Sequence, residues 1–259
     1  MKLGLEDKVI LITGAAGGIG QAIARQAANE GAAALFLTDR DGTGCNQTVA
    51  ELRSGGGTVD YLIADLADMA APPAIAAAAI ARFGRIDGLV NAAALTTRGS
   101  FVTGTPALWD QLFAVNARAP FFLMQAVIGD LLWRGAAGSI VNILSMNAYC
   151  GIPELAIYSG TKGALATLTR NAARAHMADR IRVNGINLGW VATPGEQHMQ
   201  ADILGRGPGW LAEDSAKMPL GRLITAEESA RLAVFLLGEA SVPMSGSVVD
   251  FEQKVAGGI

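Results

Sequence analysis

The stretch Val9-Ile10-Leu11-Ile12-Thr13-Gly14-Ala15-Ala16-Gly17-Gly18-Ile19-Gly20 decides the fold of this 259-residue chain. Its first four residues form an uninterrupted apolar run, which is typical of a parallel strand buried on both faces. The glycines permit a tight turn, and a helical pattern follows them directly. A helix start presents unpaired N–H groups to an anion, so the stretch predicts nucleotide binding by Gly14, Gly18, Ile19 and Gly20. The alternative is a simple turn that uses glycine for its positive φ.

Strands and helices alternate along the rest of the chain. The sequence predicts further strands at 34–38, 61–64, 88–90, 139–144, 182–187 and 246–250, and further helices at 43–52, 72–83, 108–133, 157–178 and 226–237. Because no composition break divides this alternation, we expect residues 1–259 to form one α/β domain. It should be a doubly wound domain of the Rossmann type, with a mostly parallel seven-stranded sheet and helices on both faces. Residues 190–222 lose the pattern and are interpreted as a substrate cap or a linker.

Composition and charge exclude several classes of protein. The net charge of −3 argues against nucleic acid or an anionic membrane as a partner. The nearest candidate for a membrane span, residues 62–80, is interrupted by charges and prolines, and Glu6 and Asp7 precede the first apolar run. Cys45 and Cys150 lie far apart and give neither a disulfide framework nor a zinc spacing. We therefore expect a cytoplasmic protein without a metal site.

Polar residues follow the predicted strands. Asp39 ends the second strand about twenty residues past the glycine loop, where a carboxylate can accept hydrogen bonds from an adenosine ribose. It would also repel a 2′-phosphate, which favours NAD over NADP, although Arg40 could contact such a phosphate. Ser145 ends the fifth strand. Because ligands of open parallel sheets bind beyond the carboxyl ends of the strands, Asp39, Asn91, Ser145 and the glycine loop should share one edge.

Tyr158 and Lys162 are a candidate proton-transfer pair. In a helix, residues four apart lie on one face, so the two side chains would point into the same space. Free tyrosine has a pKa of about 10, and a nearby cation favours the phenolate and lowers that pKa. An ordinary surface pair on a helix is the alternative. Asn116 falls inside the predicted helix 108–133, where it can disturb the backbone ladder and hold a water.

These motifs, in this order and spacing, resemble the classical short-chain dehydrogenase/reductase family over essentially the full chain. The resemblance implies that Asn116, Ser145, Tyr158 and Lys162 are catalytic. Tyr158 would exchange a proton with the substrate hydroxyl. Lys162 would lower the pKa of Tyr158 and bind the nicotinamide ribose. Ser145 would hydrogen-bond the substrate oxygen, and Asn116 would position a water. Beside the glycine loop, Tyr158 and Lys162, the implied cofactor contacts are Asp39, Arg40, Asp65, Leu66, Asn91, Ala92, Ala93, Gly189, Val191 and Thr193.

The chain departs from the family's pattern in places. Ala93 stands where a glycine is usual and Leu188 where a proline is usual. Substrate identity should lie in residues 190–222 and around the catalytic serine. The candidate substrate contacts are Ser145, Asn147, Leu155, Tyr158, Trp190, His198 and Trp210. For the two tryptophans the alternative is packing within the cap, and for His198 it is an exposed helix position.

The sequence therefore predicts an NAD-dependent oxidoreductase that interconverts a secondary alcohol and a ketone. Polar candidates near the site (Asn147, Glu154, Glu196 and His198) favour a sugar or polyol as this small-molecule substrate. Two alternatives stay open: an NADPH-dependent 3-oxoacyl-thioester (acyl carrier protein) reductase, and a non-catalytic nucleotide-sensing protein. The complete proton-transfer set argues against the sensor. The resemblance also implies a homotetramer, assembled through helices 108–133 and 157–178.

Overall fold

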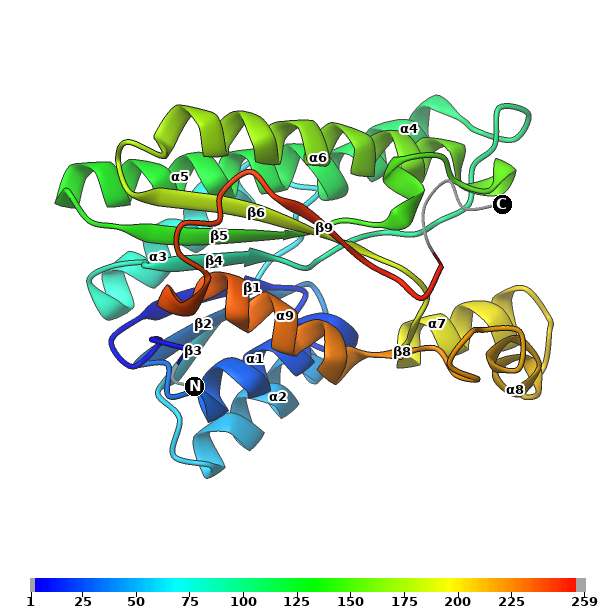
Figure 1. The fold of residues 1–259 in the computed structure, drawn as a ribbon, viewed down its shortest axis with the longest axis horizontal. Coiled ribbons are helices and arrows are strands. Elements are labelled where there is room, and N and C mark those ends of the chain that lie inside the picture. The colour runs from blue at the N-terminus through cyan, green and yellow to red at the C-terminus, as the bar shows by residue number, and fades with distance from the viewer. Residues whose placement is uncertain (1–2, 255–259) are drawn as a thin grey trace.

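Seven parallel strands form the central sheet of the computed structural model, which describes residues 3–254 (Figure 1). The strand order is β3-β2-β1-β4-β5-β6-β9, and every neighbouring pair is parallel. The strands are β1 Val9–Thr13, β2 Ala34–Asp39, β3 Val59–Ile63, β4 Gly88–Asn91, β5 Gly138–Ile143, β6 Ile181–Leu188 and β9 Val248–Phe251. The predicted Rossmann-type fold is confirmed, and the sheet is parallel throughout rather than mostly parallel.

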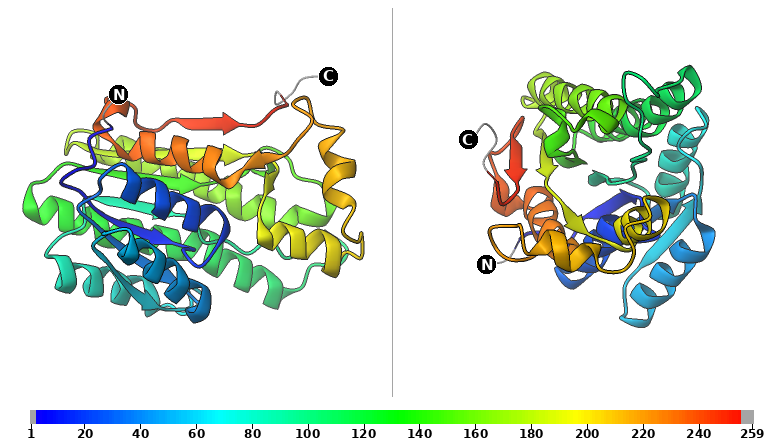
Figure 2. Two further views of the ribbon diagram at one scale, coloured as in Figure 1. Left: turned by 90° about the horizontal axis from the view of Figure 1, so that it is seen from below. Right: turned by 90° about the vertical axis from the view of Figure 1, so that its right-hand side faces the viewer.

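Helices cover both faces of this sheet, as Figures 1 and 2 show. One layer contains α1 Gly18–Asn29, α2 Gly42–Ser54 and α9 Ala226–Leu237; the other contains α3 Ala71–Phe83, α5 Ala119–Arg134 and α6 Ala156–His176. Successive side chains of a strand point to opposite faces, so Ile10 and Ile12 belong to the first core and Leu11 to the second. The continuous apolar run of β1 is therefore explained by burial on both sides.

The predicted helix 108–133 is one long helix with a wider turn inside it. It consists of α4 Pro106–Phe113, a π-helical turn at Ala114–Arg118, and α5. The π turn contains Asn116, the residue expected to disturb the backbone ladder of this helix. Within residues 3–254, this 29-residue helix, and not residues 62–80, is the helix long and apolar enough by length and composition to cross a membrane, and 61% of its most apolar window is buried inside the protein.

The cap is more ordered than its sequence pattern suggested. It contains α7 Pro194–His198, a π-helical turn at Met199–Ile203 and α8 Trp210–Ser215. A two-stranded parallel sheet of β7 Val191–Ala192 and β8 Ile224–Thr225 closes its base. Trp210, Met218 and Leu223 form a small core of its own. Helices of five or six residues complete too few turns to show a hydrophobic period, which is why the sequence analysis missed them.

Candidate active site

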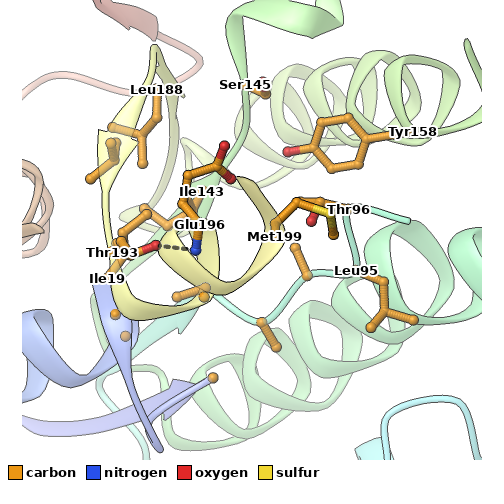
Figure 3. A pocket seen from close by; sticks show the side chains of 18 of the residues that line it. Ile19, Leu95, Thr96, Ile143, Ser145, Tyr158, Leu188, Thr193, Glu196 and Met199 are labelled. Atoms are coloured by element: carbon orange, nitrogen blue, oxygen red, sulfur yellow. Dashed lines mark hydrogen bonds between the residues drawn. The ribbon is translucent and has the colours of Figure 1, made fainter. Parts of the chain in front are cut away.

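A cavity of about 910 Å³ opens at the carboxyl ends of the strands, between the sheet and the cap (Figure 3). Residues of β2, β5 and β6, of the loops that follow β1 and β4, of α6 and of the cap line it, as the rule for open parallel sheets predicts. The predicted residues that line it are Gly14, Gly18, Ile19, Gly20, Asp39, Arg40, Asp65, Leu66, Ala92, Ala93, Ser145, Asn147, Leu155, Tyr158, Lys162, Gly189, Trp190, Val191 and Thr193. Asn91, Asn116, His198 and Trp210 are not among the lining residues.

The glycine loop forms one end of this cavity, and close backbone contacts fix its shape. Gly14 has a φ of +72°, and a Cβ there would lie 2.8 Å from the backbone N of Ala93. A Cβ on Gly20 would overlap the carbonyl oxygen of Gly14. The Thr13 hydroxyl accepts hydrogen bonds at 3.1 Å from the backbone N–H groups of both Ala92 and Ala93. The methyl of Ala93 packs against the second core, so this departure from the family's pattern is accommodated.

Asp39 lies at the carboxyl end of β2 with its carboxylate held in place. Oδ2 accepts a hydrogen bond from Ala16 N at 3.0 Å, and Oδ1 accepts one from Asp41 N at 3.0 Å. The first of these bonds joins β2 to the glycine loop. A carboxylate oxygen can accept a further bond, so Asp39 has capacity left for a ribose hydroxyl. The loop and this carboxylate are therefore placed to hold the pyrophosphate and the adenosine ribose of a dinucleotide.

Ser145, Tyr158 and Lys162 come together at the middle of the cavity. Figure 3 shows the Ser145 and Tyr158 side chains directed into the same space. The Lys162 ammonium is buried, donates a hydrogen bond to the Ile143 carbonyl oxygen at 2.7 Å, and lies 5.7 Å from the centroid of the Tyr158 ring. Ser145 caps a short 3₁₀ turn at Met146–Ala148 and accepts hydrogen bonds from Asn147 N and Nδ2, both at 3.2 Å.

The pKa values of this pair differ from the prediction. Burial raises the pKa of Tyr158 to about 12, the interaction with Ser145 lowers it in part, and the charge of Glu196 adds to the rise. Burial also lowers the pKa of the Lys162 ammonium to about 8. The expected lowering of the Tyr158 pKa by Lys162 is therefore wrong for this structure, because desolvation of the buried phenolate is the largest influence on that pKa. Near neutral pH Tyr158 holds its proton and can donate it.

Asn116 holds the loop that follows β4 instead of lining the cavity. Its Oδ1 accepts a hydrogen bond from Leu95 N at 2.8 Å, and its Nδ2 donates to Leu95 O at 2.8 Å and to Thr161 Oγ1 at 3.1 Å. The π turn brings this side chain inward, so Asn116 is fully buried. Its amide therefore joins the β4 loop to α6, one turn from Tyr158. The predicted bound water stays a prediction.

Three other predicted contacts are corrected by the structure. The Asn91 amide donates to Asn142 Oδ1 at 2.8 Å inside the sheet rather than facing the cavity. His198 is exposed, and its Nδ1 bonds Asp202 at 2.7 Å. Trp210 is only 1% exposed and donates from Nε1 to Gln197 Oε1 at 2.8 Å, so it stabilises the cap rather than contacting substrate. These are the ordinary packing roles that the sequence analysis had weighed for the tryptophan and the histidine.

The cavity is also lined by residues that the sequence did not indicate. They include Thr96, Arg98, Met146, Ile152, Met199, Gln200, Arg206 and Glu252. Figure 3 labels Thr96 and Met199 among the side chains that line the cavity with Tyr158. Glu196, which was considered only as a hydroxyl-binding candidate, accepts hydrogen bonds on Oε1 from Trp190 Nε1 at 2.8 Å and from Gln200 Nε2 at 2.7 Å. Irregular loops and short helices carry these residues, so no periodic pattern could have indicated them.

Comparisons with known proteins agree with this geometry. A family model described as enoyl-(acyl carrier protein) reductase matches residues 14–253. The 2-(S)-hydroxypropyl-CoM dehydrogenase 3 of Xanthobacter autotrophicus is 35% identical over 245 residues, which are 94% of each chain. The probable galactose dehydrogenase GalD of Rhizobium meliloti is 31% identical over 253 residues, 95% of this chain and 93% of that one. The crystal structure of L-sorbose reductase from Gluconobacter frateurii, complexed with NADPH and L-sorbose, matches with a TM-score of 0.92 and 28% identity over 100% of both chains.

The fold and the site define a dinucleotide-binding oxidoreductase. The chain belongs to the short-chain dehydrogenase/reductase family, as its resemblance predicted. It is an NAD(P)-dependent enzyme acting on CH–OH groups, and it interconverts a secondary alcohol and a ketone. The non-catalytic sensor is thereby set aside.

Proposed function

We propose that this enzyme is an NAD-dependent dehydrogenase whose substrate is a sugar, a polyol or a close derivative of one. The observation that carries the cofactor choice is the Asp39 carboxylate, which is fixed by Ala16 N and Asp41 N at the end of β2. A fixed negative charge there can accept hydrogen bonds from a ribose, and it repels a 2′-phosphate. The exposed Arg40 is the cation beside it that could offset this repulsion.

The chemistry assigned to the chain's own residues follows from their positions. In oxidation a bound nicotinamide would take the hydride of the carbinol carbon, and Tyr158 in its deprotonated form would take the hydroxyl proton, leaving a ketone. Because burial raises the pKa of Tyr158 to about 12, alkaline pH favours this direction. In the reverse direction Tyr158 donates its proton to the carbonyl oxygen. Ser145 is placed to hydrogen-bond the same oxygen and to stabilise the charge that develops on it. The Lys162 ammonium, held by the Ile143 carbonyl, would bind ribose hydroxyls of the cofactor.

A polyhydroxylated substrate is supported by the polar groups beyond Tyr158. Glu196, Gln200 and Asn147 line that part of the cavity and offer both donors and acceptors. The Glu196 Oε1 already accepts two hydrogen bonds, which fixes the carboxylate and leaves Oε2 for a ligand. Two of the relatives are named for sugars, galactose and L-sorbose.

The test is a screen of secondary alcohols, sugars and polyols with NAD and with NADP, read as reduced nicotinamide absorbance at 340 nm. We expect the kcat/KM for NAD to exceed that for NADP by about 10-fold or more, since one unfavourable charge contact is worth about 1–3 kcal/mol. Asp39→Ser should remove most of this preference, and Asp41→Ser, which changes the neighbouring helix cap, should not. A wild-type preference for NADP would refute the NAD assignment.

An NADPH-dependent 3-oxoacyl-thioester reductase is the second candidate. The description of the matching family model names an acyl carrier protein substrate, and Arg40 lies where it could contact a 2′-phosphate. Turnover of acetoacetyl thioesters with NADPH, faster than that of any polyol with NAD, would select this candidate. We favour the dehydrogenase because Asp39 is the fixed group and Arg40 is the exposed one.

We also propose that the enzyme is a cytoplasmic homotetramer. Large apolar side chains are exposed along α4 and α5, with Trp109 50%, Phe121 40%, Leu132 46% and Trp133 85% exposed. An exposed apolar surface of this kind supports contact with another copy of the chain. Light scattering should give four times the mass of the single chain, and a monomer mass would end this proposal.

A further inference from the structure

Arg98 is a cation in the cavity wall for which residues 3–254 supply no counter-ion. It lies in the loop after β4 and lines the cavity. Its Nε is buried and has no hydrogen-bond partner. Within residues 3–254 its guanidinium forms no ion pair and no hydrogen bond. A buried guanidinium N–H that stays unpaired costs free energy, so this arrangement calls for a ligand that pairs with it.

The loop around Arg98 is fixed at both of its ends. On one side, Asn116 holds both backbone polar groups of Leu95 at 2.8 Å. On the other side, Gly99 N donates to Glu154 O at 2.8 Å, and Gly99 O accepts from Ile157 N at 3.2 Å. A Cβ on Gly99 would lie 2.9 Å from the Ile157 side chain, so the loop packs closely on the start of α6. Arg98 is therefore held beside the helix turn that carries Tyr158.

The other cations in the cavity wall are already engaged or distant. Arg206 pairs with Asp214 at 2.6 Å and donates to Gln200 at 3.1 Å. Lys162 donates to the Ile143 carbonyl oxygen at 2.7 Å. Arg40 lies at the end of β2, beside Asp39. Among the described cations of the cavity wall, Arg40 and Arg98 thus keep their hydrogen-bonding capacity, and Arg98 is the one that lies beside the start of α6 rather than at the end of β2.

We propose that Arg98 binds an oxyanion group of the substrate, and that the substrate is a secondary alcohol carrying a carboxylate, a sulfonate or a phosphate. The planar guanidinium pairs with such groups through two parallel N–H···O bonds, which also orient the molecule. Orientation matters because Glu196 carries a negative charge in the same cavity and disfavours an anionic group placed near it. The anion would lie at the β4 loop, and the hydroxyl would reach Ser145 and Tyr158. This assignment rests on the proposed function, since the same molecule provides the alcohol.

The experiment compares acids with their uncharged counterparts. The pairs are gluconate with gluconamide, 3-hydroxybutyrate with 3-hydroxybutyramide, 2-hydroxypropane-1-sulfonate with its sulfonamide, and glycerol 3-phosphate with glycerol. For at least one pair, wild-type enzyme should turn over the acid with the higher kcat/KM. In Arg98→Gln the KM of that acid should rise about 10-fold to 100-fold, as expected for loss of hydrogen bonds to a charged group. The KM of the neutral partner should stay unchanged.

Matched variants separate this role from a structural one. Arg98→Lys keeps the positive charge but lacks the planar guanidinium that makes two parallel hydrogen bonds. Its KM for the acid should lie between those of the wild type and Arg98→Gln. Arg231→Gln removes an exposed arginine on α9 and should change neither KM. Because Arg98 has no protein partner, Arg98→Gln should leave the melting temperature and the affinity for NAD unchanged. Equal losses for acid and amide, or an equal loss of NAD affinity, would overturn the proposal.

A binding measurement distinguishes failure of this inference from failure of the proposed function. Acetate, methanesulfonate and inorganic phosphate are titrated into the enzyme–NADH complex and followed by ligand-observed NMR. Saturable binding of one of them in the wild type, lost in Arg98→Gln, supports the anion site even if no alcohol is oxidised with NAD. No binding of any of them, together with equal kcat/KM for acids and amides, refutes the anion site and leaves the dehydrogenase intact.

Discussion

The two ends of the cavity are built by different means. At the glycine loop the backbone makes the site, because added Cβ atoms at Gly14 and Gly20 would meet other backbone atoms. At the substrate end side chains make it, and loops or short helices carry Arg98, Glu196 and Gln200. Backbone contacts tolerate almost no change, whereas side chains can be exchanged without disturbing the fold. This difference explains how one fold can hold one cofactor while relatives act on different substrates.

The largest effect on activity should come from a change at Tyr158, which lies between the two ends of the cavity. Tyr158→Phe removes the hydroxyl and leaves the ring in its buried position, so kcat should fall by about 10²-fold to 10⁴-fold. The affinity for NAD, measured by calorimetry, should change little because the glycine loop is untouched. Rates like those of the wild type in this variant would contradict the proton-transfer role.

A change in the glycine loop should affect the backbone-built end alone. Gly20→Ala places a methyl group against the carbonyl oxygen of Gly14, and no side-chain rotation can relieve that overlap. We expect a loss of about 3 kcal/mol in the free energy of unfolding, measured by urea denaturation, and a large loss of NAD affinity. Gly17→Ala is the matched control for stability, since a Cβ there has nothing within 4 Å. Similar unfolding free energies in the two variants would disprove the steric argument.

The smallest effect concerns the pH dependence of stability. Burial lowers the pKa of Lys162 to about 8, so between pH 8 and the usual lysine value near 10.5 the unfolded chain binds this proton more tightly than the folded protein. The Lys162 contribution to the unfolding free energy therefore rises with pH across that window, by at most about 3 kcal/mol. Above pH 9, Cys45 opposes this rise in unfolding free energy. Burial raises the pKa of its thiol to about 11, so the folded protein holds that proton more tightly than the unfolded chain. Above pH 10, the raised pKa of Tyr158 opposes the rise in unfolding free energy in the same way.

The measurement is the difference in unfolding free energy between the wild type and Lys162→Met, followed from pH 7 to pH 9. Lys162→Met keeps an unbranched buried side chain and removes the titrating group. The unfolding free energy of the wild type should therefore increase relative to that of the variant as pH rises. Parallel pH curves for the two proteins would mean that Lys162 does not titrate in this range.

Much of the fold could be read from the chain because its signals are local. The bounds of α9 were predicted as Ala226–Leu237 and found there, since its apolar period is regular and Thr225 and Glu228 form a capping box. The β1 run and the glycines after it indicated both the strand and the turn. The short helices of the cap and the β7–β8 pair were not predicted, because two strand residues or one helical turn give no period to detect.

The candidate site divides in the same way. Spacing placed Ser145 at the ligand edge of the sheet and Tyr158 beside Lys162 on one helix face, and the resemblance to the family brought the three into one site. Sequence could not show that Asn116 turns inward on a π turn to hold Leu95, nor that Trp210 is buried in the cap. Those outcomes depend on which distant segment packs against the residue.

The sequence by itself determined the sheet, the glycine loop and the Tyr158–Lys162 pair, since each is encoded by neighbours within a few residues. Only the tertiary structure decided the pKa values of that pair, since burial is a property of the whole fold and is the largest cause of both shifts. The tertiary structure likewise left Arg98 without a partner in the cavity wall, because a guanidinium finds or lacks a counter-ion according to which loops surround it.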